Sequence, residues 1–209
     1  VDSDVDADQQ SYQYYVSVID SCNRESTISN ISSSILLNAS ANNGLTNDLI
    51  WNSYINWDVG VNRYELYRKV NDVYEINPFV SLGPSVLSFE DDISSYLGSN
   101  ASGQFCYKIK AVEEPNSFGF SSESYSNEFC ANQDPIIFAP NSFTPNGDNI
   151  NDNWFPLVNL LDFSEYRLYI YNRLNHLIFE TSSSYESWDG SYLNNDKIVP
   201  VGVYLYFIE

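Results

Sequence analysis

The sequence predicts an all-β fold made of tandem β-sandwiches, and three observations lead to it. Aromatic residues make up 16% of the 209 residues, with 17 Tyr and 12 Phe, a composition typical of strands. Short alternating apolar and polar runs are separated by Gly, Asn, Asp and Ser, and few windows show the helical period of about 3.6 residues. A β unit also recurs at a spacing of about 90 residues, the size of an immunoglobulin-like sandwich.

Charge and composition exclude several classes of function. The formal net charge of −19 opposes binding to nucleic acid, whose phosphates need basic partners, and disfavours anionic membrane surfaces. No apolar run reaches the roughly 18 residues of a membrane-spanning helix. Because the chain has no Met and no N-terminal apolar segment, we expect it to be part of a longer protein whose signal peptide lies elsewhere.

An internal repeat defines the domain organisation. Residues 12–20 (YQYYVSVID) align with residues 105–113 (FCYKIKAVE), and Ser29-Asn30 align with Ser126-Asn127. The complete copy is expected at residues 34–134. Residues 1–33 then hold only the last two strands of a preceding domain of the same kind, and two strands do not bury a core of their own.

The strands of residues 34–134 follow in order, and their pattern resembles a fibronectin type III domain. Residues 35–37 open the domain, and residues 49–51 contribute Trp51 as a buried tryptophan. Residues 61–69 form the next strand, with Tyr64, Leu66 and Arg68 on one face. Further strands are expected at residues 86–91, 103–112 and 122–131.

The cysteines are expected to form a disulfide. Cys106 and Cys130 occupy repeat positions where the first copy has Gln13 and Ser33, so both are present in one copy and both absent from the other. The last two strands of such a sandwich are neighbours, and closing the loop between them adds about 3 kcal/mol of stability. A disulfide implies the periplasm or beyond. The alternative is two buried free thiols; Cys22 has no evident partner.

Five blocks in the last 70 or so residues point to one family. They are, in chain order, residues 143–152 (FTPNGDNIND), 166–173 (YRLYIYNR), 179–180 (FE), 188–190 (WDG) and 200–204 (PVGVY). In this order and spacing they resemble the type B C-terminal domain of Bacteroidetes proteins exported by the type IX secretion system. This is the gliding motility-associated C-terminal domain family, with blocks FTPNGDGIND, YxLxIYNRxG, VFE, WDG and PxGVYxY.

The resemblance implies a domain at residues 135–209 with a role in export and attachment. It implies a non-enzymatic, SprB-like gliding-motility adhesin, with an outer-membrane protein of the SprF/PorP family and the secretion machinery as partners, located at the cell surface. Asn175 replaces the usual turn glycine, and Asn tolerates positive φ. Family members continue past Glu209 into a final strand, so we expect an exposed edge on strand 202–208. Its aromatic residues are candidate partner contacts: Tyr204, Tyr206 and Phe207.

Catalytic and metal chemistry has little support in the sequence. His176, the single histidine, lies in a turn, and no nucleophile elbow, phosphate loop or dinucleotide motif occurs. No cofactor is expected. Calcium is the one candidate ligand, held by Asn146, Asp148 and Asp152, because short Asp/Asn loops supply the oxygens it needs. The alternative is a metal-free turn in which these side chains bond the loop backbone.

Trp188 and its neighbours admit two interpretations. Trp188 can be a core residue followed by a turn, or it can join Tyr185, Tyr192 and Tyr204 in an aromatic platform for sugars. Two other functions therefore stay open beside the adhesin. One is an accessory region of a secreted polysaccharide-degrading enzyme, and the other is a carbohydrate-binding module.

Overall fold

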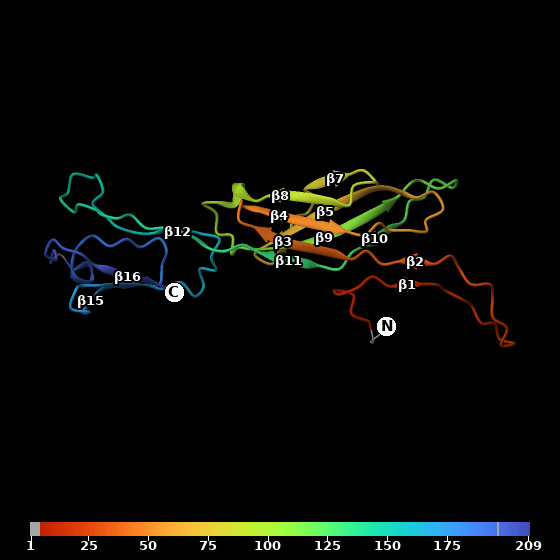
Figure 1. Ribbon diagram of the computed structural model, residues 1–209, viewed down its shortest axis with the longest axis horizontal. Helices are drawn as coiled ribbons and strands as arrows, with labels where there is room; N and C mark the ends of the chain where they lie inside the picture. The colour runs from red at the N-terminus through yellow and green to blue at the C-terminus, as the bar shows by residue number, and fades with distance from the viewer. Residues whose placement is uncertain (1–4, 196) are drawn as a thin grey trace. The chain divides into compact units, whose positions relative to one another are not determined.

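The computed structural model describes residues 5–195 and 197–209, and these residues form strands and two short 3-10 helices. The predicted all-β fold class is therefore confirmed. Within these ranges no helix is long and apolar enough to cross a membrane. The elements are labelled in Figure 1. They are β1 Gln13–Tyr14, β2 Ser32–Ser33, β3 Leu37–Asn42, β4 Thr46–Trp51, β5 Val61–Val70, β6 Val73–Tyr74, β7 Val80–Leu82, β8 Ser88–Asp92, η1 Ser94–Tyr96, β9 Gln104–Glu113, β10 Glu123–Tyr125, β11 Phe129–Asn132, β12 Ile136–Phe138, β13 Leu157–Asn159, β14 Leu168–Tyr171, β15 Leu177–Thr181, η2 Tyr192–Asn194 and β16 Leu205–Ile208.

The chain divides into two compact units. The first comprises the residues up to Ser95 together with Gln104–Gln133, and the second comprises Tyr96–Gly103 together with Asp134–Glu209. The division after residue 133 lies beside the domain boundary expected between residues 134 and 135.

Two antiparallel sheets build most of the first unit. One has the strand order β3-β4-β8; the other has the order β10-β9-β5-β6, with β11 also paired to β9 and β7 to β5. Buried side chains come from both sheets, among them Leu37, Leu49 and Trp51 from the first and Tyr64, Leu66, Phe105, Tyr107 and Ile109 from the second. A two-layer arrangement with a shared core is what the sequence predicts for residues 34–134. The likeness to the fibronectin type III family itself stays a prediction.

Local residue choice explains the tight turn of the second sheet. Asn71 and Asp72 alone connect β5 to β6, and both have positive φ, 49° and 63°. Two central residues with positive φ make the turn whose twist matches antiparallel strands, and Asn and Asp tolerate that conformation better than most side chains.

The expected strand 122–131 is interrupted in the structure. It forms β10 and β11, and between them the Ser126 hydroxyl accepts a hydrogen bond from the Ile109 N–H at 2.9 Å. The side chain thus replaces a backbone acceptor at this position, which breaks the regular ladder along β9.

A buried charge is neutralised inside the first unit. The Arg68 guanidinium donates to both Asp91 carboxylate oxygens at 2.8 Å, and the Tyr107 hydroxyl donates to Asp91 at 2.8 Å. Asn47 donates to the Tyr107 hydroxyl at 2.7 Å. Burial, followed by the Asp91 charge, raises the pKa of Tyr107. Full pairing is what allows an acidic side chain to be only 4% exposed.

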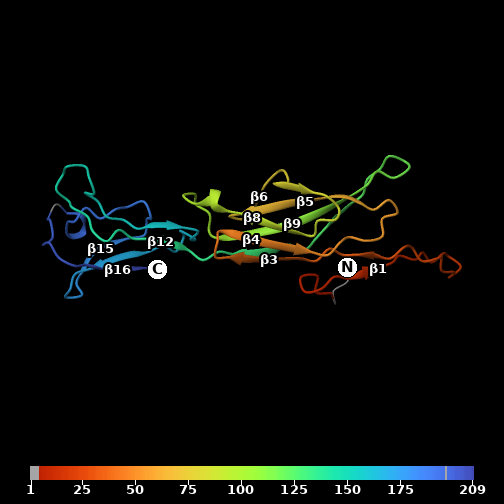
Figure 2. The same ribbon diagram turned by 45° about the horizontal axis from the view of Figure 1, so that its top comes forward.

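The second unit, drawn in teal and blue in Figure 2, has two small sheets. β12 pairs with β13, and the other sheet has the strand order β15-β14-β16, all antiparallel. Its core is Trp154, Tyr166, Leu168, Ile170, Ile178, Phe179 and Trp188. Because β16 pairs only with β14 among the described residues, it is an edge strand, as the sequence predicts for this segment.

Candidate partner-binding site

The segment that ends in β16 presents two different faces. Tyr204 and Ile208 pack against the core of the second unit. The alternate residues Val203, Leu205 and Phe207 are exposed. Side chains alternate across a strand, so one face of β16 closes the core and the other places apolar surface in water.

The candidate partner residues divide between these faces. The Tyr204 ring packs edge-on against Trp188 at 5.1 Å, and its hydroxyl donates to the Pro200 carbonyl at 2.6 Å. The Tyr206 ring lies 5.2 Å from Trp154 and remains half exposed. Phe207 is on the opposite face and is also half exposed. Tyr206 and Phe207 are therefore available to a partner, whereas Tyr204 supports the core.

Sequence reasoning missed part of the exposed apolar row. Val201 and Val203 precede β16 and are almost fully exposed, in line with Leu205 and Phe207. The signal was present as valines at every second position. The search was limited to aromatic residues, which hid it.

A groove runs along the inner side of this segment. It has a volume of about 570 Å³ and lies between residues 140–145 and residues 198–206. Phe143, Trp154 and Trp188 are among the apolar side chains that line it. The groove and the β16 edge are continuous, because Tyr204, Leu205 and Tyr206 belong to both.

Trp188-Asp189-Gly190 forms the side of this groove as a structural motif. Trp188 is buried, and its indole N–H donates to the Ser191 carbonyl at 2.8 Å. A Cβ on Gly190, whose φ is +81°, would lie 2.7 Å from Pro145 Cγ, so only glycine fits. The core interpretation of Trp188 agrees with this burial. The aromatic sugar platform loses its central member, although Tyr185 and Tyr192 are exposed.

The loop that contains the candidate calcium ligands is held by hydrogen bonds to its own backbone. Asp152 accepts N–H groups from Asn146 and Gly147 at 2.8 Å and from Asn149 at 2.6 Å. Asp148 accepts from Ile150 at 2.8 Å, and the Asn146 side chain accepts from the Asp148 N–H at 3.0 Å. These bonds, led by the one from Gly147, lower the pKa of Asp152.

This geometry is that of the hydrogen-bonded turn. A calcium ion would need the same oxygens, above all both oxygens of Asp152, and would have to displace their N–H donors. Calcium binding by Asn146, Asp148 and Asp152 stays a prediction.

The Asn-Arg turn forms as expected although it lacks the family's glycine. Asn175 has a φ of 61°, and its N–H donates to the Asn172 carbonyl at 2.9 Å. The Asn172 side chain accepts the N–H groups of Leu174 and His176 at 2.9 and 3.0 Å. His176 is an exposed turn residue next to β15.

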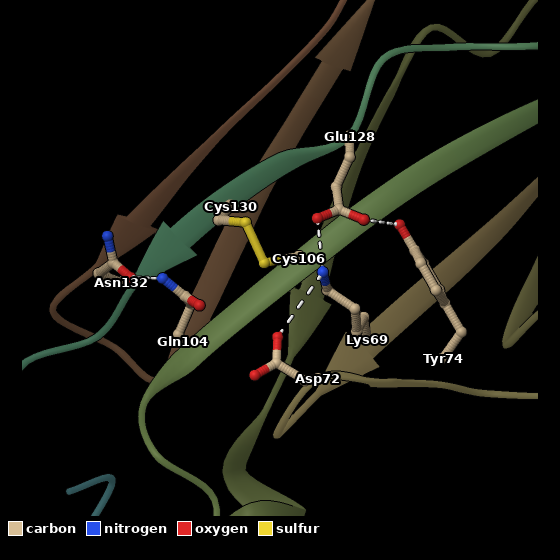
Figure 3. The surroundings of a disulfide bond; sticks show 8 residues. All are labelled: Lys69, Asp72, Tyr74, Gln104, Cys106, Glu128, Cys130 and Asn132. Carbon is tan, nitrogen blue, oxygen red and sulfur yellow. Dashed lines mark hydrogen bonds and ion pairs between the residues drawn. A yellow bond between two sulfur atoms is a disulfide. The ribbon is translucent and has the colours of Figure 1, made fainter. Parts of the chain in front are cut away.

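The first unit contains a disulfide between Cys106 and Cys130, the pair selected from the repeat, shown in Figure 3. The two residues lie directly opposite each other on β9 and β11, with their Cα atoms 3.9 Å apart. Nearby, Glu128 accepts hydrogen bonds from the Lys69 ammonium at 2.6 Å and from the Tyr74 hydroxyl. These bonds lower the pKa of Glu128, and burial followed by Glu128 raises the pKa of Tyr74. Because the sulfurs are bonded to each other, this cluster is structural and offers no thiolate to a metal.

Comparison with known proteins places the second unit in an export context. Residues 137–209 match the family model described as the CHU_C type IX secretion signal domain. No curated protein matches the chain. A cargo of this system crosses the outer membrane, meets the type IX secretion machinery, and ends outside the cell or on its surface. Residues 137–209 therefore give this chain the signal domain of a type IX secretion cargo.

Proposed function

We propose that this chain is the C-terminal stalk and attachment region of a large, non-enzymatic cell-surface protein, a gliding-motility adhesin. In this proposal, the second unit directs export and then binds an outer-membrane protein of the SprF/PorP family. The first unit serves as a stalk. The observation that carries the proposal is an exposed apolar edge strand inside a matched secretion signal domain.

The edge strand supports attachment through its shape and its chemistry. Val203, Leu205 and Phe207 leave apolar surface in water, at a cost of roughly 25 cal/mol for each Å². Among the described residues, β16 pairs on one side only, so its other side is open to a partner strand. Adding a strand at such an edge combines backbone hydrogen bonds with side-chain contacts.

The stalk role of the first unit rests on its composition. Its charged side chains are largely paired with one another, and its core is closed by two sheets and a disulfide. A closed, acidic sandwich suits a spacer that remains soluble and does not adhere to anionic lipid.

Capture of the partner by the full chain tests the proposal. We would immobilise the chain, add solubilised outer membranes from a bacterium with type IX secretion, and identify bound proteins by mass spectrometry. The expected result is recovery of a SprF/PorP-family protein. Recovery should fall at least about tenfold with Leu205→Ser/Phe207→Ser, because about 1.4 kcal/mol of lost contact is a factor of ten.

A matched control uses two apolar residues elsewhere. Phe118 and Phe120 are at least as exposed and lie in a turn of the first unit. Phe118→Ser/Phe120→Ser should leave recovery unchanged. Equal recovery with all three proteins, or recovery of no protein of that family, contradicts the attachment role.

Export is tested separately from attachment. A fluorescent reporter joined to residues 134–209 should reach the cell surface in a strain with type IX secretion and remain in the periplasm in a secretion mutant. Release of the Leu205→Ser/Phe207→Ser reporter into the medium would show that export and attachment use different features of the unit.

A further inference from the structure

Residues 12–34 form an antiparallel hairpin that repeats the hydrogen bonding of β9 and β11. In the hairpin, the Val16 N–H donates to the Ser29 hydroxyl at 2.9 Å, and the Ser29 N–H donates to the Val16 carbonyl at 2.9 Å. The first unit has the same pair of 2.9 Å bonds between Ile109 and Ser126. The hairpin is therefore a second copy of this device.

Two further features agree between the copies. Each serine hydroxyl donates to the carbonyl of the next residue, at 2.8 Å in Asn30 and 2.6 Å in Asn127. The strand registers also correspond, because Gln13 lies opposite Ser33 as Cys106 lies opposite Cys130. Residues 13 and 33 are the repeat positions of the two cysteines. The two hairpins therefore match in register as well as in sequence.

The two copies differ in what covers their apolar face. On β9, Tyr107, Ile109 and Ala111 are at most 1% exposed. Their counterparts in the hairpin are exposed: Tyr14 is 46%, Val16 66% and Val18 64% accessible. The side chains are of the same kind at the same alternate positions. The hairpin thus presents a core face with no core over it among the described residues.

The covered copy shows which elements belong over such a face. β9 pairs along its other edge with β5, from Glu113 opposite Val61 to Phe105 opposite Val70. The sheet β3-β4-β8 provides the buried side chains Leu37, Leu49 and Trp51. The residues of β9 become buried only because these strands are present.

Asn127 makes the contact that joins the hairpin to the opening strand of its domain. The Leu37 N–H donates to Asn127 Oδ1 at 2.7 Å, and Asn127 Nδ2 donates to the Leu37 carbonyl at 3.1 Å. The amide side chain thus bonds both backbone groups of one residue of β3. Asn30 holds the same position in the hairpin, where its Nδ2 donates to the Asn56 carbonyl at 2.5 Å.

We infer that residues 12–34 are the closing hairpin of a further β-sandwich whose other strands are supplied by polypeptide N-terminal to the hairpin. Asn30 binds both backbone groups of one residue of that sandwich's opening strand. Tyr14, Val16 and Val18 enter its core, and the free edge of residues 13–20 pairs with its third strand. The ligand of this surface is an extended apolar strand, recognised by an amide side chain and by backbone pairing.

The test supplies those strands from the chain itself. Residues 34–103, which cover β9 and β11, are joined through Gly103 directly to Ser11 of the full chain, because Ser11 aligns with Gln104. The readout is hydrogen exchange of the amides of residues 12–20 and 28–33. We expect exchange at least about 100-fold slower than in the parent chain, since amides in a closed core open only with the domain.

Variants separate the amide contact from general coverage. Asn30→Ala should remove most of the added protection in the fusion, and Thr27→Ala, a change on the same strand, should not. Asn127→Ala in the parent chain is the calibration, because it removes the contact with Leu37. Protection that survives Asn30→Ala overturns the role of Asn30.

Other outcomes overturn the inference as a whole. Residues 37–132 report in the same experiment whether the original sandwich has folded. If they are protected while the hairpin exchanges as fast as in the parent chain, the hairpin is no part of a sandwich. If the parent chain sediments as a dimer with its hairpin amides already protected, a second copy covers this face instead.

Discussion

The two units reach stability by different means. The ion pairs found among the described residues all lie in the first unit, where Arg68, Lys69 and Lys110 are each held by two carboxylates. In the second unit the recurring contacts are aromatic, such as Phe143, Trp188 and Tyr204 in sequence. Its polar side chains mostly accept the N–H groups of their own loops, as Asp152 does.

This difference follows from what each unit has to bury. The long strands β5 and β9 carry basic residues that are little exposed, and burying a charge is costly unless it is paired. The second unit has short strands and long loops, whose backbone groups need partners that strands do not supply. The first unit should therefore be sensitive to lost charge partners, and the second to altered loops.

The largest expected effect is the loss of Asp91 from the first unit. Asp91→Ala leaves the Arg68 guanidinium and the Tyr107 hydroxyl without their shared acceptor, and should lower the free energy of unfolding by about 3 kcal/mol. Urea unfolding of the full chain, followed by tryptophan fluorescence, measures it.

The control for Asp91 removes an exposed partner. Asp72 lies 3.9 Å from Lys69 and is almost fully exposed, so Asp72→Ala should change stability by less than about 1 kcal/mol. Similar effects of the two variants would show that burial of the pair is not what makes it important.

The disulfide should have the next largest effect, again on the first unit alone. Opening the Cys106–Cys130 bond should lower stability by about 3 kcal/mol, because it frees a loop of 24 residues in the unfolded chain. Calorimetry with and without reductant should move one transition and leave that of the second unit in place.

Chemical mapping checks the bond itself. Without reductant, a thiol reagent should label Cys22, which is free and exposed, and should label neither Cys106 nor Cys130. Labelling of both in non-reduced protein would mean that the thiols are free.

The sequence predicted those features that depend on local rules. Asn175 was expected at positive φ because asparagine tolerates it, and the structure has it there. Cys106 and Cys130 were paired because they appear and vanish together across the repeat. In both cases a pattern within the chain carried the physical constraint.

Features that depend on the meeting of distant segments were not predicted. Arg68 was placed on the face of Tyr64 and Leu66, but nothing in the sequence identified Asp91 as its partner. Pro145 and Gly190 are 45 residues apart, and only the fold shows that a Cβ at Gly190 would meet the proline ring. The break between β10 and β11 was missed because it depends on the hydroxyl of Ser126 reaching across to Ile109.

The loops of the second unit give a smaller, opposite test. Gly190→Ala forces a Cβ to 2.7 Å from Pro145 Cγ at a φ of +81°, and should destabilise the second unit by about 1–3 kcal/mol. Gly147→Ala has a similar φ of +79° with no atom within 4 Å, so it isolates the backbone strain. Calorimetry of the full chain should show a larger shift for Gly190→Ala, in the transition of the second unit only. A shift no larger than that of Gly147→Ala would mean that the contact with Pro145 does not matter.

The smallest effect is the pH response of the loop that closes on Asp152. Its backbone N–H bonds lower the pKa of Asp152 below the usual value of 3.8. The loop therefore gains stability that is complete above the unfolded pKa and is lost as the pH falls through the lower folded pKa. The transition of the second unit should fall in temperature below about pH 4, and Asp152→Asn should lower it at pH 7 and flatten this response. Asp134→Asn, an exposed carboxylate of the same unit, is the control. Because the oxygens of Asp152 already accept N–H groups, a chelator should leave the transition unchanged at pH 7. A fall on chelation that Asp148→Ala abolishes would instead establish the calcium site and break the contrast between the two units.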